Sequence, residues 1–181
     1  MKNIAVVIGH SPDSPGKFSE LIHQSEYFYN KEVAGYLLNV DVYKRPEGGG
    51  YKTQMRKLGG LVRPKKYDLI IDLHFNAFDN IDNGVGHGVE TISYPGNEKT
   101  QAWGKEYCRR ISNHFCNNNR GAKTATEGGR GWWFLHYMPT NAIILEPFFG
   151  DESESLGFTN EAEYAGIIME WLESISIKPI T

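Results

Sequence analysis

Short, almost uninterrupted apolar runs recur along the chain, separated by longer stretches with helical spacing. The runs are rich in Val and Ile, which favours strands that are buried on both faces. They lie at residues 4–8, 40–43, 68–75, 89–94 and 142–146. Parallel strands need a crossover connection, which is usually a helix, so this alternation predicts an α/β fold. We expect a single domain with a mostly parallel twisted sheet of about six strands and helices on both faces.

Four segments between these runs have the spacing of helices, at residues 25–39, 53–62, 98–115 and 160–175. Asn160 precedes two glutamates in the last of them, which predicts an N-cap and a favourable helix dipole. The Gly-, Asn- and Thr-rich stretch 117–131 gives no such signal, and we expect it to be irregular.

Composition excludes several classes of protein. The chain has 181 residues, which suits one domain, and a formal net charge of −3, which argues against nucleic-acid binding. No apolar run approaches the roughly 20 residues that span a bilayer. The opening "MKNIAVVIGH" lacks a cleavage motif, so we expect a first strand and no signal peptide. Cys108 and Cys116 are the only cysteines and stand too far apart on one helix for a disulfide.

Polar residues stand at the carboxyl ends of three predicted strands. His10 follows the first, His74 lies in "IIDLHFNAF", and Glu146 ends "AIILE". Ligands of α/β sheets bind outside these ends, so we expect the three side chains to meet. A histidine at such a place could also simply mark where its strand surfaces, and Glu146 could be a capping or salt-bridged glutamate.

Glu26 is the fourth candidate residue, near the start of the first predicted helix. It shares one helical face with Asn30, Val33, Ala34 and Leu37, and therefore points inward. A carboxylate in a core costs several kcal/mol unless it is paired or binds a metal. The alternatives are that Glu26 caps its own helix or pairs with a basic residue.

Two histidines and one carboxylate form the ligand set of a hydrolytic zinc site with an open fourth position. His10, Glu26 and His74 are the candidate ligands. The water in the open position needs a general base, and Glu146 is the candidate. The sequence shows no nucleophilic serine or cysteine paired with histidine, which disfavours covalent catalysis.

Five segments, in this order, resemble zinc-dependent N-acetylmuramoyl-L-alanine amidases of the amidase-3 type, which occur among bacterial cell-wall hydrolases and phage endolysins. They are "VVIGHSPDSPG", "SEYFYNKEVAGYL", "IIDLHFNAF", "GVETISYPG" and "NAIILEPFF". The resemblance implies Zn²⁺ bound by His10, Glu26 and His74, with Glu146 as the acid and base. It also implies cleavage of the amide between N-acetylmuramic acid and L-alanine in peptidoglycan.

On this resemblance, residues 1–181 form the amidase catalytic domain without a separate wall-binding domain, and we expect a monomer. Without a signal peptide, an endolysin of this kind would wait in the host cytoplasm for a membrane pore. The alternative functions are another zinc amidohydrolase or carboxypeptidase, or a wall-binding module that has lost catalysis.

Four further residues remain open. His87, in the loop "GVGHGV", either contacts substrate or is a solvated loop residue. Arg130 could bind a carboxylate of the stem peptide with two hydrogen bonds. Trp132 and Trp133 cannot both face the core of one strand, so one could stack on a ligand or lie at the rim of the core.

Overall fold

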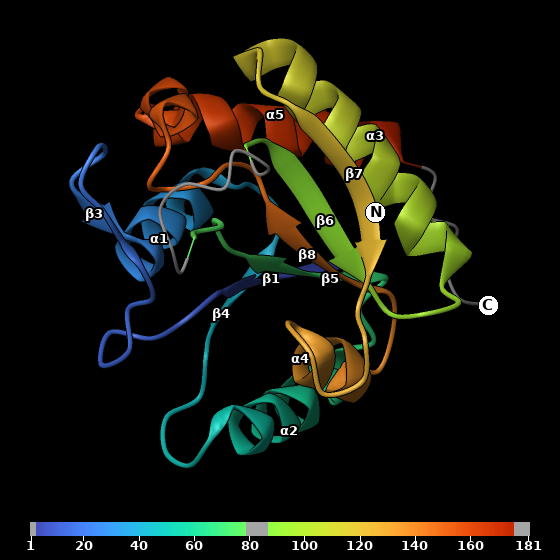
Figure 1. Cartoon of the computed structure of the whole chain (residues 1–181). Helices are drawn as coiled ribbons and strands as arrows, with labels where there is room; N and C mark the ends of the chain where they lie inside the picture. The colour runs from blue at the N-terminus through green and yellow to red at the C-terminus, as the bar shows by residue number, and fades with distance from the viewer. Residues whose placement is uncertain (1–2, 79–86, 176–181) are drawn as a thin grey trace.

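The computed structural model describes residues 3–78 and 87–175 and is built around one sheet (Figure 1). The six strands are β1 (Ile4–Ile8), β4 (Asp41–Lys44), β5 (Leu69–Leu73), β6 (Val89–Ser93), β7 (Asn119–Thr124) and β8 (Ala142–Glu146). They lie in the order β4-β1-β5-β8-β6-β7. The first four are parallel, β6 is antiparallel to β8, and β7 is parallel to β6. The prediction of a mostly parallel sheet of about six strands is confirmed.

Helices cover both faces of the sheet, as the sequence predicted (Figure 1). One face carries α1 (Glu26–Tyr36), α3 (Glu98–Phe115) and α5 (Glu161–Ser174), and the other carries α2 (Tyr51–Val62) and α4 (Trp132–Tyr137). Residues of β1 alternate between the two cores, with Val6 on the α1 side and Val7 on the α2 side. All residues of the four central strands are therefore buried, and the nearly continuous apolar runs of β1, β5 and β8 fill both cores.

The helix ends follow local capping. The Asn97 side chain accepts a hydrogen bond from the Thr100 amide, and Asn160 caps α5 in the same way through the Glu163 amide. The first helix is shorter than expected, because it ends at Tyr36. A short hairpin of β2 (Phe18–Ser19) and β3 (Gln24–Ser25) leads into it, and 3₁₀ turns lie at Arg63–Lys65 and Ser153–Phe158.

Two expectations were wrong. The stretch 117–131 contains β7, an edge strand held by backbone pairing to β6, whose polar sequence NRGAKT has no apolar alternation. Trp132 and Trp133 lie on the short helix α4 and not on a strand. The expectation that only one of them faces the core is confirmed, since Trp132 is buried in the core and Trp133 is half-buried at its rim.

None of the described helices is long and apolar enough to cross a membrane. Cys108 and Cys116 are free thiols, as predicted.

Candidate active site

Adjacent parallel strands bring the three polar strand-end residues to one edge of the sheet. β5 lies between β1 and β8, so His10, His74 and Glu146 follow or end neighbouring strands and line one cavity. His10 has a φ of 66°, in the left-handed region that non-glycine residues seldom adopt. Strained backbone of this kind is frequent at functional sites.

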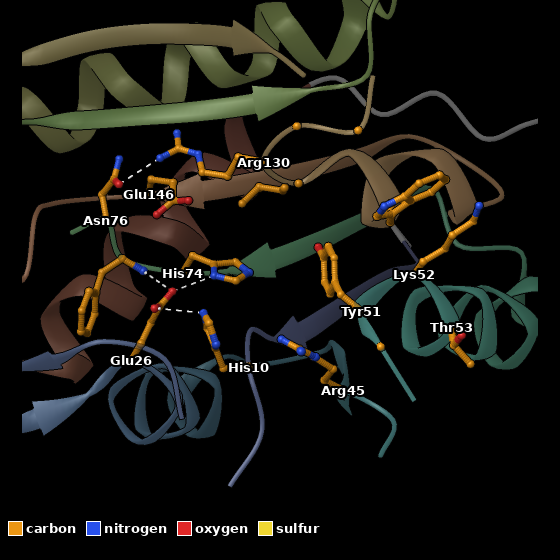
Figure 2. Close-up of a pocket in the computed structure, with 17 residues that line it drawn as sticks. His10, Glu26, Arg45, Tyr51, Lys52, Thr53, His74, Asn76, Arg130 and Glu146 are labelled. Carbon is orange, nitrogen blue, oxygen red and sulfur yellow. Dashed lines mark hydrogen bonds and ion pairs between the residues drawn. The ribbon is translucent and has the colours of Figure 1, made fainter. Parts of the chain in front are cut away.

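Glu26, the first residue of α1, lies between the two histidines (Figure 2). Its Oε2 is 3.1 Å from Nε2 of His10, and its Oε1 is 2.7 Å from Nδ1 of His74. The amide of Phe75 also donates to Oε1, at 3.2 Å. Glu26 is therefore a core-facing carboxylate, as the helical spacing predicted, and the side chains that it contacts are the two imidazoles.

Charge and burial act against each other on this cluster. Burial by itself would raise the pKa of Glu26, but hydrogen bonds from His10 and His74 outweigh it and lower the pKa to about 2. Burial likewise opposes the charged form of His74, yet the carboxylates of Asp72 and Glu26 hold its pKa well above the usual value. Without a metal, the cluster is thus held together by charge.

Asp72 fixes the orientation of the His74 ring, a role that sequence reasoning missed. Its Oδ2 lies 3.1 Å from Nε2 of His74, on the ring edge opposite Glu26. Such a carboxylate–histidine pair leaves the other ring nitrogen oriented toward a metal. The sequence could have indicated this contact, because Asp72 and His74 are two residues apart and such residues lie on the same face of a strand.

Two glycines leave the space that the cluster occupies. A Cβ on Gly9 would lie 2.3 Å from the Leu73 carbonyl oxygen and 2.6 Å from the His74 ring. A Cβ on Gly16, whose φ is 78°, would lie 2.6 Å from Oε2 of Glu26. Larger residues at either position would displace a candidate ligand.

Glu146 is 5% exposed, and its Oε2 has no hydrogen-bond partner within the described part of the chain. Burial raises its pKa to about 7, and the positive charges of His74 and Arg130 only partly offset this effect. It faces the cavity beside the His10–Glu26–His74 cluster (Figure 2). A buried carboxyl group that titrates near neutrality suits proton transfer in both directions.

Another buried carboxylate, Glu90, lies directly opposite Glu146 in the β6–β8 pairing. Glu90 is bound by Arg120 at 2.8 Å, by Asn76 at 3.0 Å and by Arg130. Arg130 also donates to the Asn76 side chain at 2.9 Å and lines the cavity. Burial would raise the pKa of Glu90, but the two arginines lower it, so this carboxylate stays charged. Glu90 was not singled out in the sequence, although a charged residue inside a buried strand was a usable signal.

The cavity has a volume of about 690 Å³ and two chemically different sides. The carboxylate side is lined by Glu26 and Glu146 with His10, His74, Asn76 and Arg130. It also includes the buried Glu90, which binds Asn76 and Arg130 without lining the cavity itself. The cationic side consists of Arg45, Tyr51, Lys52 and Trp133, supplied by the residue after β4, the first turn of α2, and α4. Figure 2 shows Arg45, Tyr51 and Lys52 on the far side of His10 and His74 from Asn76.

The ligand set fits a zinc ion. One donor atom from each of His10, Glu26 and His74 lies within 4.8 Å of the other two. Two imidazoles and a carboxylate are the donors of hydrolytic zinc sites, which keep one position open. The cavity beside this cluster supplies the space for that open position.

The other candidate residues lie in different places. Arg130 reaches the cavity, and Trp133 lines its cationic side. His87 is exposed, pairs with Glu152 at 3.2 Å and does not line the cavity. His114 pairs with Glu163 at 2.7 Å on the surface.

Comparison with known proteins agrees with this geometry. The family model described as Amidase_3, N-acetylmuramoyl-L-alanine amidase, matches residues 4–172. Comparison with curated proteins found no significant match.

Several solved structures share the fold. The catalytic domain of the CD27L endolysin targeting Clostridia difficile is 25% identical, with a TM-score of 0.75 over 98% of this chain and 100% of that one. Cwp6 from Clostridium difficile is 22% identical, with a TM-score of 0.75 over 96% of this chain. This chain spans only 29% of the length of Cwp6. The catalytic domain of CwlV from Bacillus (Paenibacillus) polymyxa var. colistinus is 16% identical, with a TM-score of 0.68 over 98% of this chain and 100% of that one.

Proposed function

Since the chain belongs to the Amidase_3 family of N-acetylmuramoyl-L-alanine amidases, we propose that it is a zinc-dependent amidase. Its substrate is the bond between N-acetylmuramic acid and L-alanine in peptidoglycan. The observation that carries the proposal is the meeting of a His–Glu–His cluster and a buried, unpartnered Glu146 oxygen in one cavity.

In this proposal His10, Glu26 and His74 hold the zinc ion, and Asp72 keeps the His74 ring in place. A zinc ion bound there supplies Lewis-acid polarisation of the scissile carbonyl and of the attacking water. Glu146 takes the proton of that water and delivers it to the nitrogen of the leaving L-alanine. A pKa of about 7 lets the same carboxyl group accept and then release this proton near neutral pH.

The experiment measures products from purified peptidoglycan. The wild type should clear a wall suspension and release free amino groups of L-alanine without new reducing sugar ends. Glu146→Gln should lose clearing by at least about a hundredfold while retaining zinc. His74→Ala should lose both clearing and zinc, whereas the surface variant His114→Ala should keep both.

Other outcomes identify other functions. New reducing ends would indicate a glycosidase, and release of terminal D-alanine would indicate a carboxypeptidase. Full clearing by Glu146→Gln would contradict the role given to that residue.

The biological role in this proposal is that of a monomeric endolysin with residues 1–181 as its catalytic domain. It waits in the host cytoplasm before lysis and acts on the cell wall. Its likeness to the catalytic domain of an endolysin supports this role. Expression in a susceptible bacterium should cause lysis only after the membrane is permeabilised. Lysis without permeabilisation would contradict the role but not the amidase reaction. A dimer in sedimentation would contradict only the monomer.

A further inference from the structure

We propose that Arg45 binds a free carboxylate of the stem peptide close to the cleaved bond, and that the charge of Lys52 adds to the positive potential on this side of the cavity. The protein would then prefer stems whose second residue is D-glutamate over stems in which that α-carboxylate is an amide. This inference rests on the proposed function, since it names part of the substrate of that same cavity.

The first observation is position. Arg45 and Lys52 line the same cavity as His10, Glu26 and His74 but approach it from the opposite side (Figure 2). The volume of about 690 Å³ lies within the usual range for small-ligand pockets. A ligand that reaches the candidate zinc ligands can therefore also reach the cationic side of the same cavity.

The second observation is that Arg45 is held in place with donors remaining. Its guanidinium lies 5.0 Å from the centre of the Tyr51 ring, and its Nε donates to Oε1 of Gln54 at 2.6 Å. A ring face and one hydrogen bond fix the guanidinium plane. The two terminal nitrogens retain the geometry that binds a carboxylate with paired hydrogen bonds.

Lys52 is positioned in a similar way. Its ammonium lies 4.1 Å from the centre of the Trp133 ring. A cation–π contact orients the ammonium without neutralising its charge. Lys52 also lies in the first turn of α2, which contains no acidic residue, so the helix dipole adds to the positive potential.

The third observation is the absence of an internal counter-ion. Arg109 pairs with Glu106 on the surface of α3, and Arg130 pairs with the buried Glu90. Across residues 3–78 and 87–175, by contrast, neither Arg45 nor Lys52 has a carboxylate within 4.0 Å. Two positioned cations without a partner, in a partly enclosed site, favour an anionic ligand.

Substrate chemistry identifies that anion. The sugars of the glycan strand are neutral once the lactyl group of muramic acid is amidated, whereas the stem peptide carries carboxylates. The free carboxylate closest to the cleaved bond belongs to the second residue, a D-glutamate joined to the third residue through its side-chain carboxyl. The stem peptide would therefore extend toward α2 and α4, and the glycan toward the other end of the cavity.

The test uses two soluble substrates that differ by one group, N-acetylmuramoyl-L-alanyl-γ-D-glutamyl-L-lysine and its D-isoglutamine counterpart. We expect the zinc-loaded wild type to cleave the acid form with a kcat/KM about tenfold higher, mainly through KM. In the double variant Arg45→Gln with Lys52→Gln this ratio should fall to near one. Arg45→Lys should retain a preference, because it keeps the charge.

Arg63→Gln is the matched control, since it removes one positive charge just beyond the end of α2, at an exposed residue outside the cavity. The ratio should be that of the wild type. A wild-type ratio near one would overturn the inference, and so would a double variant that keeps the wild-type ratio.

Binding separates this inference from the proposed function. Calorimetry with Glu146→Gln and the product peptides L-alanyl-γ-D-glutamyl-L-lysine and its amide does not depend on hydrolysis. Tighter binding of the acid form, lost in the Arg45→Gln and Lys52→Gln background, would support the cationic side even if neither substrate were cleaved. Equal binding of both peptides would overturn it even if both were cleaved.

Discussion

The two sides of the cavity hold their charges in different ways. On the carboxylate side, Glu26 and Glu90 are almost fully buried, and hydrogen-bonded cations or imidazoles surround each of them. On the cationic side, Arg45 is half-buried and Lys52 is exposed, and aromatic rings hold both. Buried charges are stable only with partners, whereas exposed charges can exchange water for a ligand. Substitutions on the carboxylate side should therefore change metal binding and stability, and those on the cationic side should change substrate choice.

The largest expected effect is loss of zinc from the carboxylate side. Glu26→Gln removes the only carboxylate of the candidate ligand set. Zinc affinity should fall more than about a hundredfold, because mutating even a residue that only hydrogen-bonds a metal ligand lowers metal affinity by about 10–100-fold. Competition with a chromophoric chelator measures the affinity. Glu32→Gln, on the exposed face of the same helix, is the control, and an equal fall there would contradict the prediction.

The next effect is on folding stability. Glu90→Gln leaves Arg120 and Arg130 without their buried carboxylate, so the free energy of unfolding should fall by about 3 kcal/mol. Glu106→Gln is the contrasting variant, because Glu106 binds two arginines on the surface. This substitution should lower the free energy of unfolding by less than about 1 kcal/mol. Urea denaturation measures both values, and equal losses would remove the distinction between buried and exposed pairs.

The third prediction concerns pH and the metal-free protein. The pKa of Glu146 is raised from 4.5 to about 7, so between these pH values the folded state keeps a proton that the unfolded state releases. Stability should therefore fall as pH rises from 5 to 8, by up to about 3 kcal/mol from this group. Glu146→Gln abolishes that loss, and its stability relative to wild type should increase over the same range.

Thermal unfolding in chelator at several pH values measures this difference. The exposed residue Glu127 provides the control substitution Glu127→Gln, which should follow the wild type at each pH. A constant difference between Glu146→Gln and the wild type from pH 5 to 8 would show that burial does not raise this pKa.

The smallest effect belongs to the cationic side. Trp133 is half-buried at the cavity rim, and Trp133→Ala should cost about 1 kcal/mol of stability, well below the 3–5 kcal/mol expected for the fully buried Trp171. Chemical denaturation of Trp133→Ala and Trp171→Ala measures the contrast. Comparable losses would mean that the cationic side is part of the core and not an adaptable surface.

Sequence patterns predicted the parts of this molecule whose apolar residues follow the periodicity of a strand or a helix. The apolar runs of β1, β5 and β8 placed His10, His74 and Glu146 at one edge of the sheet, because parallel strands end together. Helical spacing predicted that Glu26 points inward, and it is buried in the structure. These positions follow from local geometry and the direction of the strands alone.

Parts of the fold that depend on long-range packing were not predicted. β7 is held by backbone pairing to β6, so its side chains carry no pattern. α4 is rich in aromatic residues that favour strands, but it begins after Gly131, which has a φ of 72°, and packs against α2. Arg45 and Lys52 come from a strand end and a helix start seven residues apart, and no period links them.

Gly9 bears on how distant members of the family should be interpreted. Any side chain at position 9 would occupy the space of the His74 ring, although position 9 contributes no group to the chemistry. A relative could therefore retain every histidine and glutamate discussed above and still be inactive, because a side chain at position 9 fills the space of the histidine ring. Inventories of reactive groups would overlook such a pseudoenzyme, whereas inspection of this single backbone position would identify it.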